Sequence, residues 1–170
     1  METAKKPWEK PPHNTYKLNV DATFFPNGTG ATGAVLRNEK GEAMAGGYWP
    51  LGCVLDAATA EAAALQKGML LIERLGCSPT IIESDCLELC QAYNGVSEIW
   101  SPYTAILVDC FVRAARIGSI TICHYSRESN SVAHKLARFA YDSKSSFVWD
   151  GDPPSFIIPD VIHDVTLFEI

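Results

Sequence analysis

The chain has 170 residues, of which 47% are hydrophobic and 20% charged, and its formal net charge at pH 7 is −6. This length suits one domain with a substantial core, and no apolar run approaches the roughly 18 residues that a membrane span needs. The negative charge argues against a protein that binds nucleic acid by bulk electrostatics, because non-specific affinity for phosphate comes from accumulated Lys and Arg.

The cysteines and the N-terminus indicate the compartment. The N-terminal sequence METAKKPWEKPPHNT lacks the continuous apolar core of a signal peptide. The six cysteines form no CxxC pair and have no histidine at zinc-finger spacing, so we interpret them as reduced, mostly buried thiols: Cys53, Cys77, Cys86, Cys90, Cys110 and Cys123. We therefore expect an intracellular protein, cytoplasmic or nuclear, with no membrane partner, and a monomer rather than an oligomer.

The first part of the chain has the pattern of an arm followed by strands. Residues 1–15 are rich in proline, lysine and polar residues and predict a flexible arm. From Tyr16, apolar and polar residues alternate, as in a strand with two different faces, and Asp21 shares its face with Asn19. Turn residues in PNGTGATG and NEKGE then predict two further strands, antiparallel to the first.

A helical period replaces the alternation between Ala57 and Leu75, where apolar residues recur every three or four positions. Asp56 is a suitable N-cap and Gly76 a suitable stop. Glu61 lies on the apolar stripe of this helix. A carboxylate therefore occupies a position where the pattern expects an apolar residue.

Two strands and three helices are predicted in the second half. PTIIESD is typical of a short buried strand that ends at Asp85, and CLELCQAYN of a short helix. SPYTAILVDCFVRAARI predicts another helix and SITICHYS the last strand. The final long helix, NSVAHKLARFAYDS, has Val132, Leu136 and Phe139 on its apolar face and His134 on the opposite side.

The order of these elements predicts an α/β fold. Three antiparallel strands followed by alternating helices and strands indicate a five-stranded mixed sheet flanked by helices. The segment that begins at Phe147 is interrupted by proline but is apolar enough to pack back on the domain. We expect a flexible arm over 1–15, the domain over 16–146 and the packed tail over 147–170.

The chain resembles the ribonuclease H-like domains abundant in plants, of the reverse-transcriptase-like type. The resemblance extends from about Tyr16 to Phe168 and rests on KLNVDATF, GATGAVLRNEKGE, AEAAALQKGM, IIESDCLEL, RESNSVAHKLAR and WDGDPPSFI. It implies a ribonuclease H-like fold and hydrolysis of the RNA strand of RNA–DNA hybrids with two Mg²⁺ or Mn²⁺ ions. Two such ions, about 3.5–4 Å apart, activate a water and stabilise the leaving oxygen.

The resemblance also implies roles for four residues. Asp21 matches the aspartate that bridges both ions, and Glu61 and Asp85 match the second and third ligands. His134 stands where ribonucleases H have an aspartate. Neutral imidazole is a poorer ligand for Mg²⁺ than for transition ions, which predicts weak cleavage, whereas RuvC-type resolvases of the same superfamily can use a histidine at this position.

Further residues are candidates for substrate contacts. His124 falls where ribonucleases H place a mobile histidine that assists product release or proton transfer, although a hydrogen-bonded structural histidine explains it equally well. Asn130 and Arg127 precede the last helix and are expected to contact the substrate. Arg127 also belongs to a set of basic residues that fits either a strip beside the cleft or a solvated helix face, namely Arg113, Arg116, Arg127, Lys135 and Arg138.

Each candidate also has a simpler explanation. Asp85 can cap a helix, Glu61 can interact with a helix dipole and Asp21 can be an ordinary strand residue. His134 alone fits an exposed surface. The order of the three acids on their elements favours one shared cleft, and two hypotheses remain for its function. The first is a metal-dependent ribonuclease, and the second is a catalytically impaired module that binds nucleic acid or a protein partner.

Overall fold

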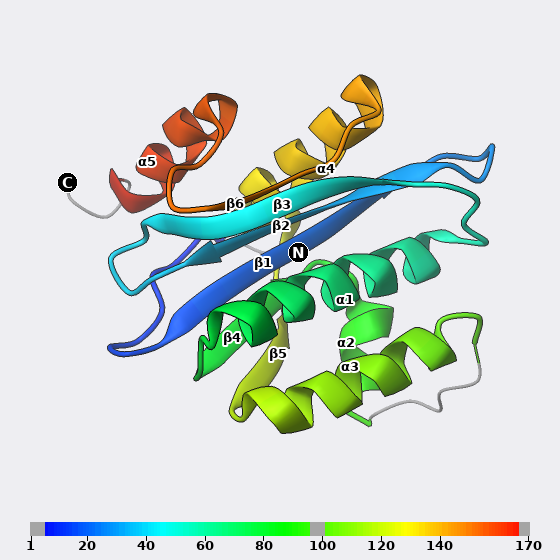
Figure 1. The fold of residues 1–170 in the computed structure, drawn as a ribbon, viewed down its shortest axis with the longest axis horizontal. Coiled ribbons are helices and arrows are strands. Elements are labelled where there is room, and N and C mark those ends of the chain that lie inside the picture. Colours follow the sequence, from blue (N-terminus) through cyan, green and yellow to red (C-terminus); the bar gives the residue numbers. More distant parts are fainter. Residues whose placement is uncertain (1–5, 96–100, 167–170) are drawn as a thin grey trace.

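The computed structural model describes residues 6–95 and 101–166. At its centre is a six-stranded mixed sheet in the order β5-β4-β1-β2-β3-β6 (Figure 1). The strands are Tyr16–Phe24 (β1), Gly30–Arg37 (β2), Ala43–Leu51 (β3), Thr80–Ser84 (β4), Ile120–His124 (β5) and Phe147–Asp150 (β6). β1, β2 and β3 are antiparallel, whereas β4 runs parallel to β1 and β5 parallel to β4. The predicted α/β fold with an antiparallel start is confirmed.

The sheet has six strands rather than the predicted five. The additional strand, β6, belongs to the C-terminal segment and pairs antiparallel with β3, so that Trp149 lies opposite Gly46. Gly46 is required there, because a Cβ at this position would clash with the Trp149 ring. The edge of β3 offers unpaired backbone groups to any nearby strand. A strand as short as Phe147–Asp150 has too few residues to show an alternating pattern in the sequence.

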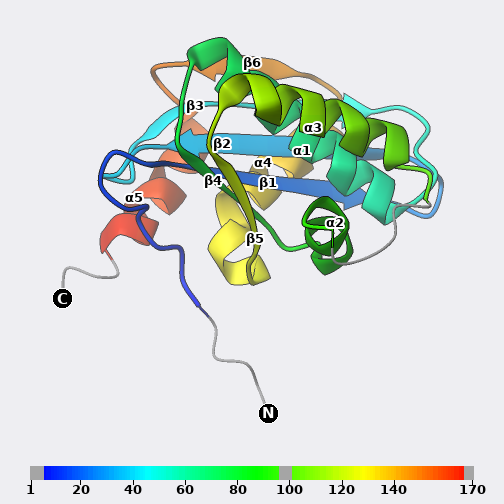
Figure 2. The same ribbon diagram turned by 90° about the horizontal axis from the view of Figure 1, so that it is seen from below.

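Helices cover both faces of the sheet. α1 and α3 lie on one face with α2 beside them, and α4 and α5 lie on the other (Figures 1 and 2). The helices are Ala57–Leu75 (α1), Leu87–Tyr93 (α2), Thr104–Ile117 (α3), Ser131–Ser143 (α4) and Ile158–Thr166 (α5). α1 has the predicted bounds, because the Asp56 carboxylate accepts a hydrogen bond from the Thr59 N–H and Gly76 ends the helix with φ of 67°.

The sheet separates two cores. The larger core contains Leu18, Leu65 and Leu107 between the sheet and the α1 side, and the smaller contains Val35 and Leu136 on the α4 side. Within the described residues, no helix combines the length and apolarity needed to cross a membrane.

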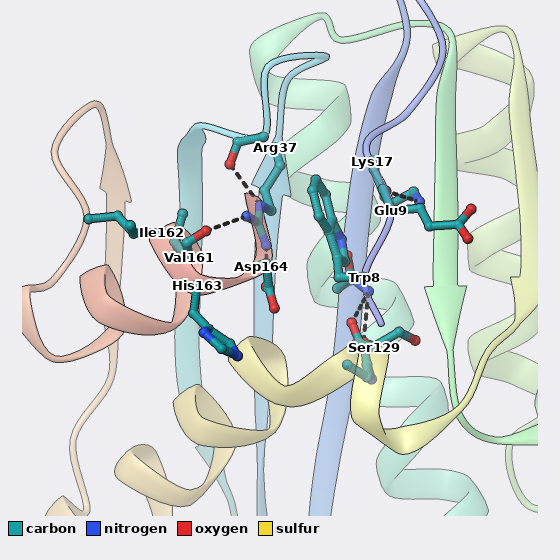
Figure 3. Close-up of polar contacts among 12 residues, drawn as sticks. Trp8, Glu9, Lys17, Arg37, Ser129, Val161, Ile162, His163 and Asp164 are labelled. Atoms are coloured by element: carbon teal, nitrogen blue, oxygen red, sulfur yellow. Dashed lines mark hydrogen bonds and ion pairs between the residues drawn. The ribbon is translucent and has the colours of Figure 1, made fainter. Parts of the chain in front are cut away.

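One buried side chain, Arg37, joins both ends of the described chain to the sheet (Figure 3). Its guanidinium lies 3.6 Å from the Trp8 ring centroid and 2.7 Å from Asp164 Oδ2, and it donates a hydrogen bond to the Val161 carbonyl. Trp8, within the predicted flexible arm, is 1% exposed and donates a hydrogen bond to Asn19. The division of the chain into arm, domain and tail stays a prediction, and residues 1–5 and 167–170 lie outside the described residues.

Candidate metal centre

The site lies where β1 continues beyond its pairing with β4. The last parallel pair is Asn19 with Glu83, so Asp21 lies past the paired part of β4. Side chains from both faces of the sheet reach this position. Glu61 comes from the second turn of α1, Asp85 follows the end of β4, and His134 comes from α4 on the opposite face.

The structure brings three of the predicted site residues together. Asp21, Glu61 and Asp85 each present a carboxylate oxygen, and these oxygens all lie within 4.8 Å of one another. Glu61 Oε2 is buried and has no hydrogen-bond partner among the described residues. Three carboxylates at this spacing repel one another, which a hard divalent cation with oxygen ligands would relieve.

Burial and mutual repulsion perturb the ionisation of the cluster. Burial, and then the charges of Asp21 and Asp85, raise the pKa of the Glu61 carboxyl well above its ordinary value. Burial, and then the charge of Asp21, also raise the pKa of Asp85, while Arg127 acts in the opposite direction. In the absence of a cation, Glu61 and Asp85 therefore hold protons more tightly than exposed carboxylates do.

His134 pairs with one member of the cluster. Its Nδ1 lies 2.9 Å from Asp21 Oδ2, and 42% of its side chain is exposed. The hydrogen bond to Asp21 raises the pKa of the imidazole, against the effect of its partial burial. Protonated His134 therefore supplies a positive charge beside the cluster.

Gly33 allows this pairing. It is the cross-strand partner of Asp21, and α4 packs directly over it. A Cβ at Gly33 would clash with the Ala133 carbonyl oxygen and would lie 2.7 Å from the Ala137 nitrogen. Because only glycine fits this close approach, the backbone of α4 sits beside β1 and β2 and brings His134 within reach of Asp21.

The predicted substrate-binding residues lie in different environments. Arg127 is on the surface, with Nε 3.7 Å from Asp85 Oδ2 and 79% of its side chain exposed. His124 is exposed and its Nε2 lies 3.1 Å from the Asp85 carbonyl oxygen. Asn130 is only 1% exposed; it donates a hydrogen bond to the Val20 carbonyl and accepts one from Asn19. Arg127 and His124 therefore border the cluster, whereas Asn130 links β1 to the start of α4.

The predicted basic strip is divided between the two faces of the sheet. Arg113 and Arg116 are on α3, where both lie near Glu73. Lys135 and Arg138 are on α4, on the other face. A strip on one side of the acidic cluster can therefore contain only part of the predicted set.

A buried amide network supports the site and was not recognised from the sequence. Asn19 donates hydrogen bonds to Glu83 and Asn130 and accepts one from Trp8. It lies two residues before Asp21 on the same face of β1, so it ties that strand to the segment that precedes His134. The signal in the sequence was the carboxylate of Glu83 directly after the apolar pair Ile81 and Ile82 of a buried strand.

An open mixed sheet with helices on both faces and an acidic cluster beside its central strand defines a ribonuclease H-like protein. The sequence matches the family model described as reverse transcriptase-like over residues 19–140, and the chain belongs to this family. No curated protein matches the sequence.

Solved structures show the same fold. Ribonuclease H1 from Halobacterium salinarum is 22% identical over 76% of this chain and 98% of its own, with a TM-score of 0.72. The N-terminal RNase H domain of a Mycobacterium tuberculosis protein is 20% identical, covers 76% and 94% of the two chains and has a TM-score of 0.71. LC11-RNase H1 in complex with an RNA/DNA hybrid is 21% identical, covers 76% and 98%, and has a TM-score of 0.65.

Proposed function

We propose that this protein is a divalent-metal-dependent nuclease of ribonuclease H type that hydrolyses the RNA strand of RNA–DNA hybrids. The observation that supports this most directly is the convergence of Asp21, Glu61 and Asp85 within 4.8 Å, from three different elements. A fold gains nothing in stability from gathering like charges, so their convergence indicates a role for an external cation.

The residues present fit divalent ions. The donors are hard carboxylate oxygens, which suit Mg²⁺ and Mn²⁺, and Glu61 Oε2 is a buried acceptor without a protein partner among the described residues. Asp21, Glu61 and Asp85 would hold the metal. When bound, such ions activate a water for in-line attack on phosphorus and stabilise the leaving oxygen.

The protein's own groups position this chemistry. β1, α1 and the end of β4 fix the three carboxylates on rigid elements, which limits the cost of reorganisation. His134 holds a proton at Nδ1 against Asp21 Oδ2 and so orients that carboxylate. Arg127 and His124, exposed beside Asp85, are placed to contact the phosphates of a bound strand.

The test is cleavage of a labelled RNA–DNA hybrid in Mg²⁺ and in Mn²⁺. We expect Asp21→Asn to lower the rate by more than about 100-fold, beyond the 10–100-fold typical for losing a group that only supports a ligand. Asp56→Asn is the matched control, because Asn is also a good N-cap and Asp56 serves α1 rather than the cluster. Equal rates for wild type and Asp21→Asn would refute the proposal.

The histidine makes the metal preference testable. With His134 in place of a carboxylate, we expect cleavage to be weak in Mg²⁺ and stronger in Mn²⁺, and His134→Asp to raise the Mg²⁺ rate by about 10-fold. A wild-type rate in Mg²⁺ that falls when aspartate is introduced would show instead that the imidazole itself takes part.

The pairing of His134 with Asp21 also favours a second candidate function. An imidazolium 2.9 Å from the central carboxylate partly neutralises the cluster. If wild type and His134→Asp are both inert in both metals, we propose instead a ribonuclease H-like module that binds nucleic acid or a protein partner without cutting.

A further inference from the structure

Two neighbouring elements lead away from the candidate metal centre toward a pair of aromatic rings. Asp21 and Thr23 occupy alternate positions of β1 and so share one side of the strand, and Phe25 directly follows its last residue. On α4, His134, Arg138 and Tyr141 recur at i, i+4 and i+7 and share a face. The Asp21–His134 hydrogen bond joins the two segments at one end, and a contact between Phe25 and Tyr141 joins them at the other.

The contacts among these side chains form a defined surface. The Phe25 and Tyr141 rings are stacked, with centroids 4.1 Å apart and an interplanar angle of 25°. The Arg138 guanidinium lies 5.4 Å from the Phe25 ring centroid, with 47% of the Arg138 side chain exposed. The Tyr141 hydroxyl lies 3.3 Å from Thr29 Oγ1. We call Phe25, Arg138 and Tyr141 the aromatic platform.

A pocket continues the platform. Its volume is about 340 Å³, and it lies between the β1–β2 turn, the end of β3 and the end of α4. Tyr141 forms one wall, Lys144 contributes a positive charge, and Asn27 and Thr29 contribute polar groups. A volume of this size is at the lower end of those found for small-molecule sites, which suits a nucleotide.

The chemistry of the platform and pocket matches a nucleic-acid strand. Aromatic faces stack with any base, and Arg and Lys beside them contact phosphates. In a duplex the faces of the bases are covered by their neighbours, so stacking on a side chain requires an unpaired base. From Asp21 to Phe25 the strand spans about 13 Å and from His134 to Tyr141 the helix spans about 10 Å, the length of three to four nucleotides stacked at about 3.4 Å.

We propose that the aromatic platform and its pocket bind an unpaired stretch of the nucleic-acid strand that leaves the metal centre, with a base on Tyr141 and phosphates beside Arg138 and Lys144. This inference rests on the proposed function and names its preferred substrate as a hybrid with a single-stranded extension. In a chain of net charge −6, Arg138 and Lys144 place two basic side chains here, and Arg138 also lies 4.0 Å from Asp142 Oδ1 on the same helix.

The experiment compares binding to one RNA–DNA hybrid in three forms. The first form has blunt ends, the second has a four-nucleotide extension of its RNA strand, and the third has the same extension on its DNA strand. Fluorescence anisotropy is measured with Mg²⁺ in an Asp21→Asn background, so that bound hybrid stays intact. We expect the extended hybrid to bind about 5- to 50-fold more tightly, in line with stacking of one or two bases. Tyr141→Leu and Arg138→Gln should each remove most of that gain, and Tyr141→Phe, which keeps the ring, should retain it.

Matched controls are available on the other face of the sheet. Phe111 is 37% exposed and stacks at a tilt on Tyr93, and the Arg116 side chain is 64% exposed; both are on α3. Phe111→Leu and Arg116→Gln should keep the gain. Equal affinity for blunt and extended hybrids, or equal losses in platform and control variants, would overturn the inference. If the protein cleaves the blunt hybrid and the extension has no effect, the inference is refuted and the proposed function stands. If the extension increases affinity but the protein never cleaves, the proposed function is refuted and binding of the extension stands.

Discussion

Buried charges lie at both ends of β1, and only at one end do they cancel within the protein. Near the start of the strand, Lys17 Nζ is 3.2 Å from Glu83 Oε2, and Arg37, the cross-strand partner of Lys17, is 2.7 Å from Asp164 Oδ2. Two positive groups there meet two negative ones. Near the end of the same strand, three carboxylates lie within 4.8 Å, and the positive groups beside them are exposed to solvent in part, namely His134 at Asp21 and Arg127 at Asp85.

The difference separates a structural use of buried charge from a functional one. Paired ions inside a protein fix the arrangement of elements, and removal of one partner is costly because the other remains desolvated. Acids gathered without enough buried positive charge to balance them make the metal-free fold less stable and leave a site for an external cation. We call the start of β1 the compensated end and the acidic cluster the uncompensated end. Variants that unbalance the charges of the first, or balance those of the second, test this comparison.

The largest effect is expected when the compensated end loses a charge. Arg37→Met leaves Asp164 buried without its partner and should lower the free energy of unfolding by about 3–5 kcal/mol, measured by urea denaturation. Lys135→Met is the matched control: it breaks the exposed ion pair of Lys135 with Asp160, which lies on α5 as Asp164 does, and such a pair is worth at most about 1 kcal/mol. Similar losses for the two variants would show that burial of the Arg37 pair does not matter.

A cation supplied from solution should stabilise the uncompensated end. At 100 times its dissociation constant, a divalent ion that binds only the folded protein contributes about 2.7 kcal/mol, or about 5–10 °C in Tm for a chain of this size. Calorimetry with Mg²⁺ or Mn²⁺ should show this rise in wild type and in Asp56→Asn, and little of it in Asp21→Asn. A rise of the same size in Asp21→Asn would place the ion elsewhere.

Removal of one acid should also stabilise the metal-free protein. The pKa of Glu61 is higher in the folded state than in the unfolded chain. The contribution of this carboxyl to the free energy of unfolding is therefore fully present below its ordinary pKa of about 4.3, and it is lost as the pH rises toward the pKa of the folded state. Glu61→Gln avoids this loss, so we expect a higher free energy of unfolding than in wild type at pH 7 and almost no difference at pH 4. Urea denaturation of both proteins in the presence of a chelator, at both pH values, measures this difference. A variant less stable than wild type at pH 7 would contradict the view that the buried charge of Glu61 destabilises the metal-free protein.

The smallest effect concerns His134. Its hydrogen bond to Asp21 raises the imidazole pKa, so the stabilisation is fully present below the ordinary value of about 6.5 and disappears as the pH rises through the folded value. His134→Gln should cost less than about 1 kcal/mol at pH 5.5, because the side chain is partly exposed and screened, and nothing at pH 9. A cost that grows with pH would mean that the neutral imidazole forms the important contact.

Local patterns predicted most of the elements that form the site. α1 could be predicted to the residue because Asp56 and Gly76 are strong local signals at its two ends. The polar positions of Asp21, Glu61 and Asp85 stood out against apolar patterns, and the order of strands and helices placed them near one another. These signals depend on neighbours within a few residues, which a sequence displays directly.

Features that depend on distant partners could not be predicted. Arg37 precedes a turn and has the pattern of an exposed residue, but it is buried because Asp164 reaches it from 127 positions later. Trp8 stands among prolines and lysines, and its burial depends on the same guanidinium. β6 pairs with β3 only because the C-terminal segment returns to that edge. In each case the determining contact lies outside any local window.

The position of Arg37 also constrains the order in which the chain can fold. During synthesis at about 5–20 residues per second, the 127 residues that separate Arg37 from Asp164 take roughly 6–25 s to appear. Until then the guanidinium at the end of β2 has no acid from α5, and burying it is unfavourable. A nascent chain can therefore form its first hairpins early but can complete this end of the sheet only after Asp164 has left the ribosome.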